Sequence, residues 1–425
     1  MKLIVKIFLA VVFVSQILFA QADYVDKDKA KKALSPKIYF DAYNYLSNDS
    51  GKTELKMFFQ IPYTSLSFIR KNNKFLASYS IETDFYDSIG TRLLFEKLWK
   101  EKLVAPNYKS ARDYKNFNIS SKKFSLTPGV YSVKILITDK YSLSKVDFKK
   151  KITVRKINPE FGISDLMLYQ GKTKDGRIIP NIKNIVSSGQ DSLDVFFYVY
   201  SGKERNVLMK FRIYSIESDE AFIVNSSQLM KKGKNKITFT VKPIKLKLGK
   251  YNLGVAVIDD DTEKSVSITK NFFVRIKYFP PSITDLNLAI EEMQYIAPPS
   301  VIDDLLETKD YNERLKKFED FWKSKDPSPD TPINEVLYEY YRRVDYANKH
   351  FEHYFPGWKT DMGKVYITLG PPHQVERHPL ELGTKPYQVW YYYDINREFV
   401  FVDETGFGDY KLITPLYGDW YRYRQ

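Results

Sequence analysis

The sequence predicts a mainly β fold with an α+β C-terminal domain: two tandem Ig-like β-sandwiches, then a helix pair with a small antiparallel sheet. Three observations support this prediction. The 425-residue chain contains 33 Tyr and 29 Phe, which favour half-buried strand positions. Up to Phe279, short apolar runs alternate with polar residues and are separated by turn residues, as in β-strands. From Pro298 onward, apolar residues recur at helical spacing.

Two copies of one module are predicted from a constant offset of 120 residues (246 minus 126). Residues 126–135 resemble residues 246–255, and the similarity continues downstream. An offset this regular indicates a repeat rather than chance. It predicts sandwiches at residues 36–157 and 158–279. The downstream matches are Val154 and Arg155 with Val274 and Arg275, and residues 163–166 with residues 283–286.

Each copy contains a Gly-x-Tyr corner that opens an alternating strand, a feature of Ig-like sandwiches. Gly129 and Gly249 provide the turn in the two copies. We expect Tyr131 and Tyr251 to bury their rings while their hydroxyl groups bond to nearby backbone. Tandem sandwiches of this kind usually space or present another domain, so this part of the chain does not predict catalysis.

The N-terminus has the pattern of a secretory signal peptide over residues 1–22. A positively charged start precedes an apolar run, and residues 20–22 form a small-x-small cleavage pattern. Residues 23–35 are a polar lead-in without periodicity, which predicts a flexible segment. We therefore expect a protein of the periplasm or the extracellular space.

The absence of cysteine excludes a lipoprotein anchor, a disulfide framework, a thiol nucleophile and any Cys-ligated metal. After removal of the signal peptide, no apolar run is long enough to span a bilayer. The formal net charge is +14, but the 66 basic residues are interspersed with 52 acidic ones. We therefore expect no nucleic-acid partner. The surplus indicates a solvated surface, and peripheral association with an anionic membrane or envelope surface is the alternative.

The C-terminal part is predicted to hold a linker strand and an amphipathic helix at 280–330, and an α+β domain at 331–425. Thr331 and Pro332 predict the start of a second helix, as N-cap and first-turn proline. Leu286 is expected in the linker strand. The face of the first helix comprises Tyr311, Leu315, Phe318 and Trp322, and the later strands are predicted at 365–369, 387–393, 398–402 and 410–413.

Five motifs make the C-terminal third recognisable: Gly357-Trp358-Lys359-Thr360-Asp361, Gly363-Lys364-Val365-Tyr366-Ile367, Gly370-Pro371-Pro372, Gln388-Val389-Trp390-Tyr391-Tyr392 and Phe399-Val400-Phe401-Val402-Asp403. Together they resemble the GWxTD-domain family of exported bacterial proteins, over about residues 290–425. The sequence departs from the family pattern at Lys364, usually Arg, and at His373, usually acidic. The resemblance implies a Gram-negative envelope protein with β-rich N-terminal modules and no established biochemical activity.

Two roles are open for the signature residues. Trp358 is either an exposed anchor for a partner or a core residue, with Thr360 and Asp361 capping the following turn. The double proline pre-sets a turn and offers no N–H group to a phosphate. The residues predicted to bind a partner or to maintain the domain are Gly357, Trp358, Thr360, Asp361, Gly370, Pro371, Pro372, Trp390 and Phe407.

All four histidines lie in one window: His350, His353, His373 and His378. The first two are three residues apart at a helix end, so both can face one side. With nearby carboxylates, a zinc site is a hypothesis, although the spacing does not match His-Glu-x-x-His. No other cofactor is predicted.

Catalytic signatures are absent from the sequence, which contains no Gly-x-Ser-x-Gly elbow, phosphate loop or dinucleotide fingerprint. An enzyme is therefore not predicted. The leading hypothesis is a non-enzymatic adaptor that contacts another envelope protein in a cell-surface or secretion-related assembly. The alternatives are glycan or peptidoglycan binding by the aromatic sandwich faces, and a metal-dependent hydrolase that uses the window 350–378.

Overall fold

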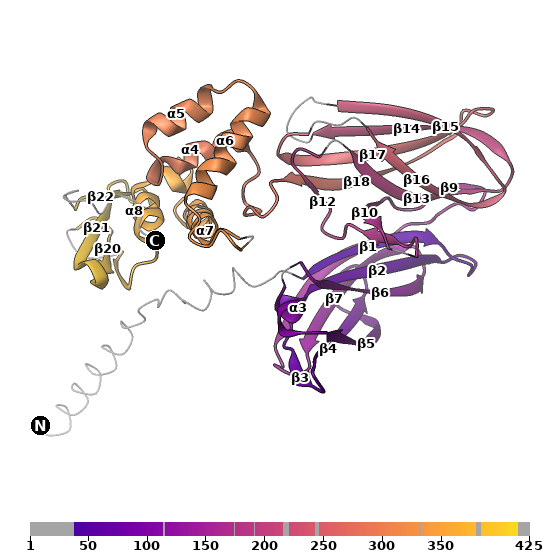
Figure 1. Cartoon of the computed structure of the whole chain (residues 1–425), viewed down its shortest axis with the longest axis horizontal. Coiled ribbons are helices and arrows are strands. Elements are labelled where there is room, and N and C mark those ends of the chain that lie inside the picture. Colours follow the sequence, from indigo (N-terminus) through magenta and orange to yellow (C-terminus); the bar gives the residue numbers. More distant parts are fainter. Residues whose placement is uncertain are drawn as a thin grey trace, which may run out of the picture. The chain divides into compact units, whose positions relative to one another are not determined.

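The computed structural model describes residues 38–414, except 114, 174, 191, 216–220, 243–245, 332 and 380–383. The predicted signal peptide (1–22) and lead-in (23–35) lie outside these residues and stay predictions. The chain divides into two compact units, one of which is Ser35–Lys277, while the other contains the residues from Tyr278 onward. Strands dominate the first unit, and the second holds most of the helices (Figure 1).

The first half of the N-terminal unit consists of two antiparallel sheets around a shared core. Along β2, apolar side chains alternate with polar ones, so Leu55, Met57 and Phe59 all point into this core. One sheet has the order β1 (Tyr39–Leu46), β2 (Thr53–Pro62), β6 (Phe117–Leu126). The other has the order β5 (Leu93–Ala105), β4 (Lys74–Tyr86), β7 (Gly129–Asp139), β8 (Lys145–Val154), and β3 (Ile69–Lys71) also pairs with β4. Short helical turns are η1 (Tyr63–Ser65) and α3 (Tyr108–Arg112).

The second half consists of two further sheets around a second core. Strand β12 pairs with β18 in parallel, and the other described pairs of this half are antiparallel. The first sheet has the order β11 (Ile178–Pro180), β10 (Met167–Lys172), β13 (Leu193–Ser201), β16 (Gly233–Val241), with β9 (Phe161–Ile163) on β13. The second has the order β12 (Ile185–Ser187), β18 (Ser265–Arg275), β17 (Gly249–Asp259), β14 (Arg205–Ser215), β15 (Ala221–Met230).

Strands β7 and β17 lie at the offset found in the sequence, and each pairs with the strand that follows it. In the turns after them, Leu143 and Glu263 both adopt positive φ, at 58° and 56°. The Tyr131 hydroxyl donates to the Thr127 carbonyl (2.8 Å), a bond of the tyrosine-corner type. The duplication and the Ig-like assignment themselves stay predictions.

The two halves of this unit are joined by a small apolar cluster and by partly buried polar bonds. The Asp165 carboxylate accepts from both nitrogens of Asn44 (2.8 Å each) and from Arg155 (2.6 Å). Asp41 accepts from Lys270 across the same junction (2.6 Å). Because charge-assisted bonds of this kind are directional, they fix how the two halves meet. The apolar cluster comprises Tyr43, Tyr45, Phe58, Met167, Ile182 and Phe196.

The C-terminal unit is an α+β domain, so the predicted mainly β fold with an α+β C-terminal domain is confirmed. Its four-stranded antiparallel sheet has the order β19 (Gln374–His378), β20 (Tyr387–Tyr392), β21 (Arg397–Asp403), β22 (Tyr410–Leu412), with η4 (Tyr393–Ile395) between β20 and β21. The helices are α4 (Leu286–Glu291), η2 (Glu292–Tyr295), α5 (Pro299–Glu307), α6 (Tyr311–Ser324), α7 (Glu335–His350), η3 (Gly357–Lys359) and α8 (Asp361–Leu369). No helix in the described ranges is long and apolar enough to cross a bilayer.

The prediction of a strand at 365–369 is wrong, because these residues form the second half of α8. Val365 and Ile367 are β-branched and suggest a strand. The helix nevertheless forms because Thr360 caps its N-terminus, accepting the N–H of Gly363 on Oγ1 (3.0 Å). Burial of one helical face against the sheet then outweighs the intrinsic preference of the residues.

Two further expectations about helices are corrected. Leu286 begins α4 rather than continuing a strand, because the Asp285 carboxylate caps it through the N–H of Leu288 (2.7 Å). The N-cap of α7 is Asn334 instead of Thr331, and its side chain accepts the N–H of Leu337 (3.0 Å). Pro332 lies outside the described residues. Helix α5 and strand β19 are not predicted from the sequence.

Candidate functional site

The glycines of the GWxTD signature lie where two backbones touch. A Cβ added to Gly357 would meet the Ala347 carbonyl oxygen of α7 at 1.9 Å. A Cβ added to Gly363 would meet the Gly357 carbonyl oxygen at the same distance. Real Cβ atoms do not approach this closely, so the packing of η3 between α7 and α8 requires glycine at both positions.

Trp358 is a core residue, with only 3% of its surface exposed. Its backbone N–H donates to the Asn348 Oδ1 (3.0 Å), and its carbonyl accepts from the Tyr295 hydroxyl (2.8 Å). Its indole Nε1 finds no hydrogen-bond partner among the described residues. Of the two roles open from the sequence, the buried one is therefore the one that this geometry fits.

Thr360 and Asp361 tie the signature to its neighbours through hydrogen bonds. Besides capping α8, the Thr360 hydroxyl donates to the Gly357 carbonyl (2.7 Å). The Asp361 carboxylate accepts the N–H of Leu412 (3.0 Å), which attaches β22 to the start of α8. Both side chains therefore satisfy backbone groups, which is a structural task.

Gly370 ends α8 in a conformation with φ of +85°, and Pro371 and Pro372 then turn the chain toward β19. Arg343, which the sequence interpretation misses, lies buried beneath this turn. Its Nη1 donates to the carbonyls of Ile367 (3.0 Å) and Thr368 (3.3 Å), so it caps the helix end. A helix-capping arginine that far away in sequence leaves no local signal.

Glu339 holds Arg343 in place through a bond from Nε to Oε1 (2.7 Å) and also accepts from Arg342 (2.7 Å). Burial alone would raise the pKa of Glu339, but the hydrogen bonds and charges of the two arginines hold it below its ordinary value. The carboxylate is therefore ionised and committed to structure.

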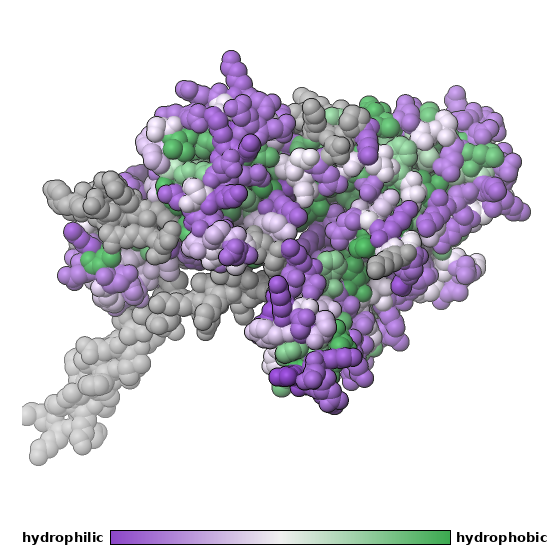
Figure 2. Space-filling model, in the orientation of Figure 1, coloured by the Kyte–Doolittle hydropathy of each residue, from purple (hydrophilic) through white to green (hydrophobic). Residues whose placement is uncertain are grey.

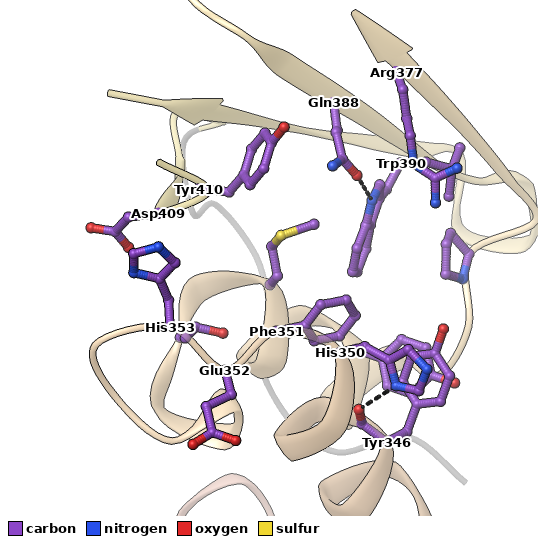
Figure 3. A pocket seen from close by; sticks show the side chains of 16 residues that line it. Tyr346, His350, Phe351, Glu352, His353, Arg377, Gln388, Trp390, Asp409 and Tyr410 are labelled. Carbon is purple, nitrogen blue, oxygen red and sulfur yellow. Dashed lines mark hydrogen bonds between the residues drawn. The ribbon is translucent and has the colours of Figure 1, made fainter. Parts of the chain in front are cut away.

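A cavity of about 260 Å³ lies between the end of α7, the start of α8 and the sheet. Trp390 forms much of its wall and is packed against Phe401 and Phe351, with ring centroids 4.8 and 5.4 Å away. The indole Nε1 of Trp390 donates to Gln388 (3.4 Å). Figure 3 shows Trp390 and Tyr410 projecting from the sheet toward Phe351 and the helices.

The histidine window does not form one site. His350 and His353 line the cavity, whereas His373 and His378 do not. His373 precedes β19 and His378 is its last residue, so an extended strand separates them by roughly 16 Å. Among the residues that the structure describes, no group of three His, Asp or Glu side chains is placed to hold a metal ion.

The two histidines at the cavity have other contacts. His350 stacks on Tyr346 with ring centroids 3.9 Å apart, and its Nδ1 lies 2.9 Å from the Tyr346 carbonyl. The His353 Nε2 is hydrogen-bonded to the Phe407 carbonyl. These contacts orient the rings toward the backbone.

Beside the cavity, three aromatic side chains project into solvent: Tyr354, Phe355 and Phe407 are 72%, 62% and 74% exposed. We call them the aromatic patch. His353 joins them, since its ring contacts Tyr354 (4.3 Å) and bonds to Phe407, and its N–H donates to the Phe355 carbonyl (3.3 Å). Hydrophilic residues predominate on the face of the molecule in Figure 2, although other large apolar side chains such as Leu98 are also exposed. Phe407 is the only residue of the aromatic patch that the sequence interpretation selected.

The family comparison agrees with this geometry. Residues 254–413 match the GWxTD domain family model. The C-terminal portion of the chain therefore contains a GWxTD domain. The match begins within β17, before the start near residue 290 that the motifs suggest, so the last strands of the N-terminal unit contribute to the family pattern. No curated protein matches the chain.

Solved structures are similar to the chain only distantly. A red sea bream transglutaminase is 10% identical over 61% of this chain and 34% of its own, with a TM-score of 0.18. Bacteroides uniformis β-glucuronidase is 9% identical over 57% of this chain and 33% of its own, with a TM-score of 0.22. Bacteroides uniformis β-glucuronidase 2, with a bound cyclophellitol-6-carboxylate aziridine, is 12% identical over 56% and 28%, also with a TM-score of 0.22. The chain therefore spans about a third of these proteins or less.

Proposed function

We propose that this is an exported, non-enzymatic envelope protein whose GWxTD domain docks a protein partner. The observation that carries the proposal is the aromatic patch next to the cavity. When another protein covers exposed Tyr and Phe side chains, their apolar surface leaves water, and this favours binding. Aromatic residues are also enriched in protein–protein interfaces.

The size of the cavity favours a protein over a small molecule. At about 260 Å³, it lies below the range of roughly 300–1,000 Å³ typical of ligand and cofactor sites. It suits one large apolar side chain of a partner, inserted into the cavity beside Trp390 and Phe351. Three polar residues also line the cavity, namely Glu352, Arg377 and Asp409. They would form hydrogen bonds or ion pairs with polar groups of the partner next to the inserted side chain.

The occupant we propose is a protein segment that inserts one apolar side chain and covers the patch. The test replaces Tyr354 in the full chain with a photoreactive phenylalanine analogue and irradiates it in native envelope extract. Leu288 and Tyr393, exposed in the same unit, receive the analogue as controls. One protein that cross-links from position 354 and from neither control supports docking at the patch. The same adducts from all three positions would contradict it.

Export is part of this proposal and rests on the pattern of residues 1–22. The mature chain then begins at Asp23, and the protein acts in the periplasm or outside the cell, with peripheral attraction to anionic surfaces. N-terminal sequencing of protein recovered from the envelope fraction tests this. A chain that still begins at Met1 would overturn it.

A metal-dependent hydrolase is not proposed, because the histidines are engaged with ring and backbone contacts and do not gather around one point. The glycan-binding alternative has a structural basis in a different place, in the N-terminal unit.

A further inference from the structure

A basic groove of about 410 Å³ opens between the two halves of the N-terminal unit. We call it the junction groove. Its floor holds four aromatic rings, two from each half: Tyr45, Phe58, Phe196 and Tyr198. Around them stand five cationic side chains and only two carboxylates, which are Lys56, Lys123, Arg177, Lys234, Lys236, Glu54 and Asp175.

Both carboxylates are already paired. Glu54 binds Lys123 (3.0 Å), and Asp175 binds Arg177 (2.5 Å). The remaining cations, Lys56, Lys234 and Lys236, form no ion pair or hydrogen bond with the described residues. Their ammonium groups lie over the floor at 4.6 Å from the Phe58 ring, 3.8 Å from Tyr198 and 5.9 Å from Phe196.

The backbone register forces these like charges together. Lys56 of β2 stands directly opposite Lys123 of β6, and like charges in that position destabilise a sheet. Lys234 and Lys236 are two residues apart on β16, so both point to the same face. Burial lowers the pKa of Lys56, and the charge of Lys123 lowers it further; burial likewise lowers the pKa of Lys234. The strand register therefore concentrates positive charge in the junction groove, and the repulsion between the lysines lowers the stability of the fold.

We propose that the junction groove binds an anionic saccharide, a sugar chain bearing carboxylate, sulfate or phosphate groups. An anion between the two lysine pairs would relieve their repulsion and accept charge-assisted bonds. The apolar face of a sugar ring would rest on Tyr198, the partly exposed ring of the floor, displacing water from both. A flat bilayer fits a recess poorly, because the charges stand inside a groove rather than on a projecting face.

The geometry also assigns an orientation. Lys56 and Lys123 belong to the first half of the unit, and Lys234 and Lys236 to the second. A ligand that meets both pairs therefore crosses the junction and contacts both halves at once. This inference uses the N-terminal unit alone, so it stands or fails independently of protein docking by the GWxTD domain.

The experiment measures binding of oligogalacturonate to the full mature chain by calorimetry, with a neutral maltooligosaccharide of equal length and poly-L-glutamate as comparison probes. We expect binding of oligogalacturonate and none of the neutral chain. The variant Lys56→Gln/Lys234→Gln should weaken binding about tenfold or more, as expected on loss of charge-assisted bonds. The same variant should melt at an equal or higher temperature than the wild type, since it relieves repulsion.

The matched control is Lys149→Gln/Lys150→Gln, which removes the same charge from the exposed β8 strand of the same unit. It should bind oligogalacturonate like the wild type. Equal loss in this control would mean unspecific attraction and would overturn the site. Poly-L-glutamate that binds as tightly as oligogalacturonate would overturn the saccharide in favour of an acidic protein segment. The absence of oligogalacturonate binding would refute the proposal outright.

Discussion

The GWxTD signature directly follows Tyr354 and Phe355 of the aromatic patch, but the surroundings of the two are opposite. Phe355 is 62% exposed, whereas Trp358, three residues later, is 3% exposed and bonded to Asn348 and Tyr295. The GWxTD motif therefore packs η3 between two helices. The residues that remain free to meet another molecule lie just outside it. Recognising the family thus identifies the fold and leaves the binding surface to be found in the structure.

The sharpest way to break this comparison is Gly357→Ala. The added Cβ would collide with the Ala347 carbonyl, so we expect a loss of about 3 kcal/mol or more in the free energy of unfolding. Gly406→Ala is the control, since a Cβ there meets nothing within 4 Å. Its φ of +76°, a left-handed conformation that Gly357 does not adopt, should cost only about 1–2 kcal/mol. Urea unfolding followed by tryptophan fluorescence measures both. Equal costs would show that close packing at Gly357 is not what the signature provides.

A second prediction concerns Glu292. Its Oε1 accepts a hydrogen bond from Asn348 (3.4 Å), and Asn348 in turn accepts the backbone N–H of Trp358 in the signature. Burial raises the pKa of Glu292 to about 7. A raised acid pKa means that the protonated form stabilises the fold. This contribution is complete below the ordinary pKa of 4.5 and is lost as the pH rises through about 7.

Glu292→Gln removes that titration. We expect the variant to exceed the wild type in stability by up to about 3 kcal/mol above pH 8, and to match it near pH 4.5. Melting temperatures across this range test the prediction. A difference between the two proteins that does not change with pH would contradict the assignment to Glu292.

A smaller effect is expected for Thr360→Ala, which removes the cap of α8 and the bond to the Gly357 carbonyl. Loss of an N-cap costs about 1–2 kcal/mol. Hydrogen exchange should show faster opening at the Gly363 amide, with Thr360→Ser retaining protection because its hydroxyl reaches the same groups. If serine fails to restore protection, the hydroxyl is not the stabilising group.

Much of the fold could be predicted, because alternating strands and amphipathic helices carry their pattern locally. The face of α6 that holds Leu315, Phe318 and Trp322 is buried as predicted. Helix α8 was not predicted, because Val365 and Ile367 suggest a strand and the arginine that caps its end comes from the distant helix α7.

The sites were harder to predict for the same reason. The sequence predicted one site from four histidines that are close in sequence, but the extended strand β19 separates His373 from His378. The junction groove draws lysines from β2, β6 and β16, which are far apart in sequence. Only the register of the strands brings such charges together, and no local pattern records it.

The central claim is that the aromatic patch binds while the signature maintains the fold. The most direct test is the affinity of Phe355→Ser/Phe407→Ser for the partner identified by cross-linking, measured beside its melting temperature. Both side chains are exposed, so stability should change by less than about 0.5 kcal/mol, while affinity should fall about tenfold or more, as expected for aromatic residues at the centre of an interface. Unchanged affinity in this folded variant would contradict the claim.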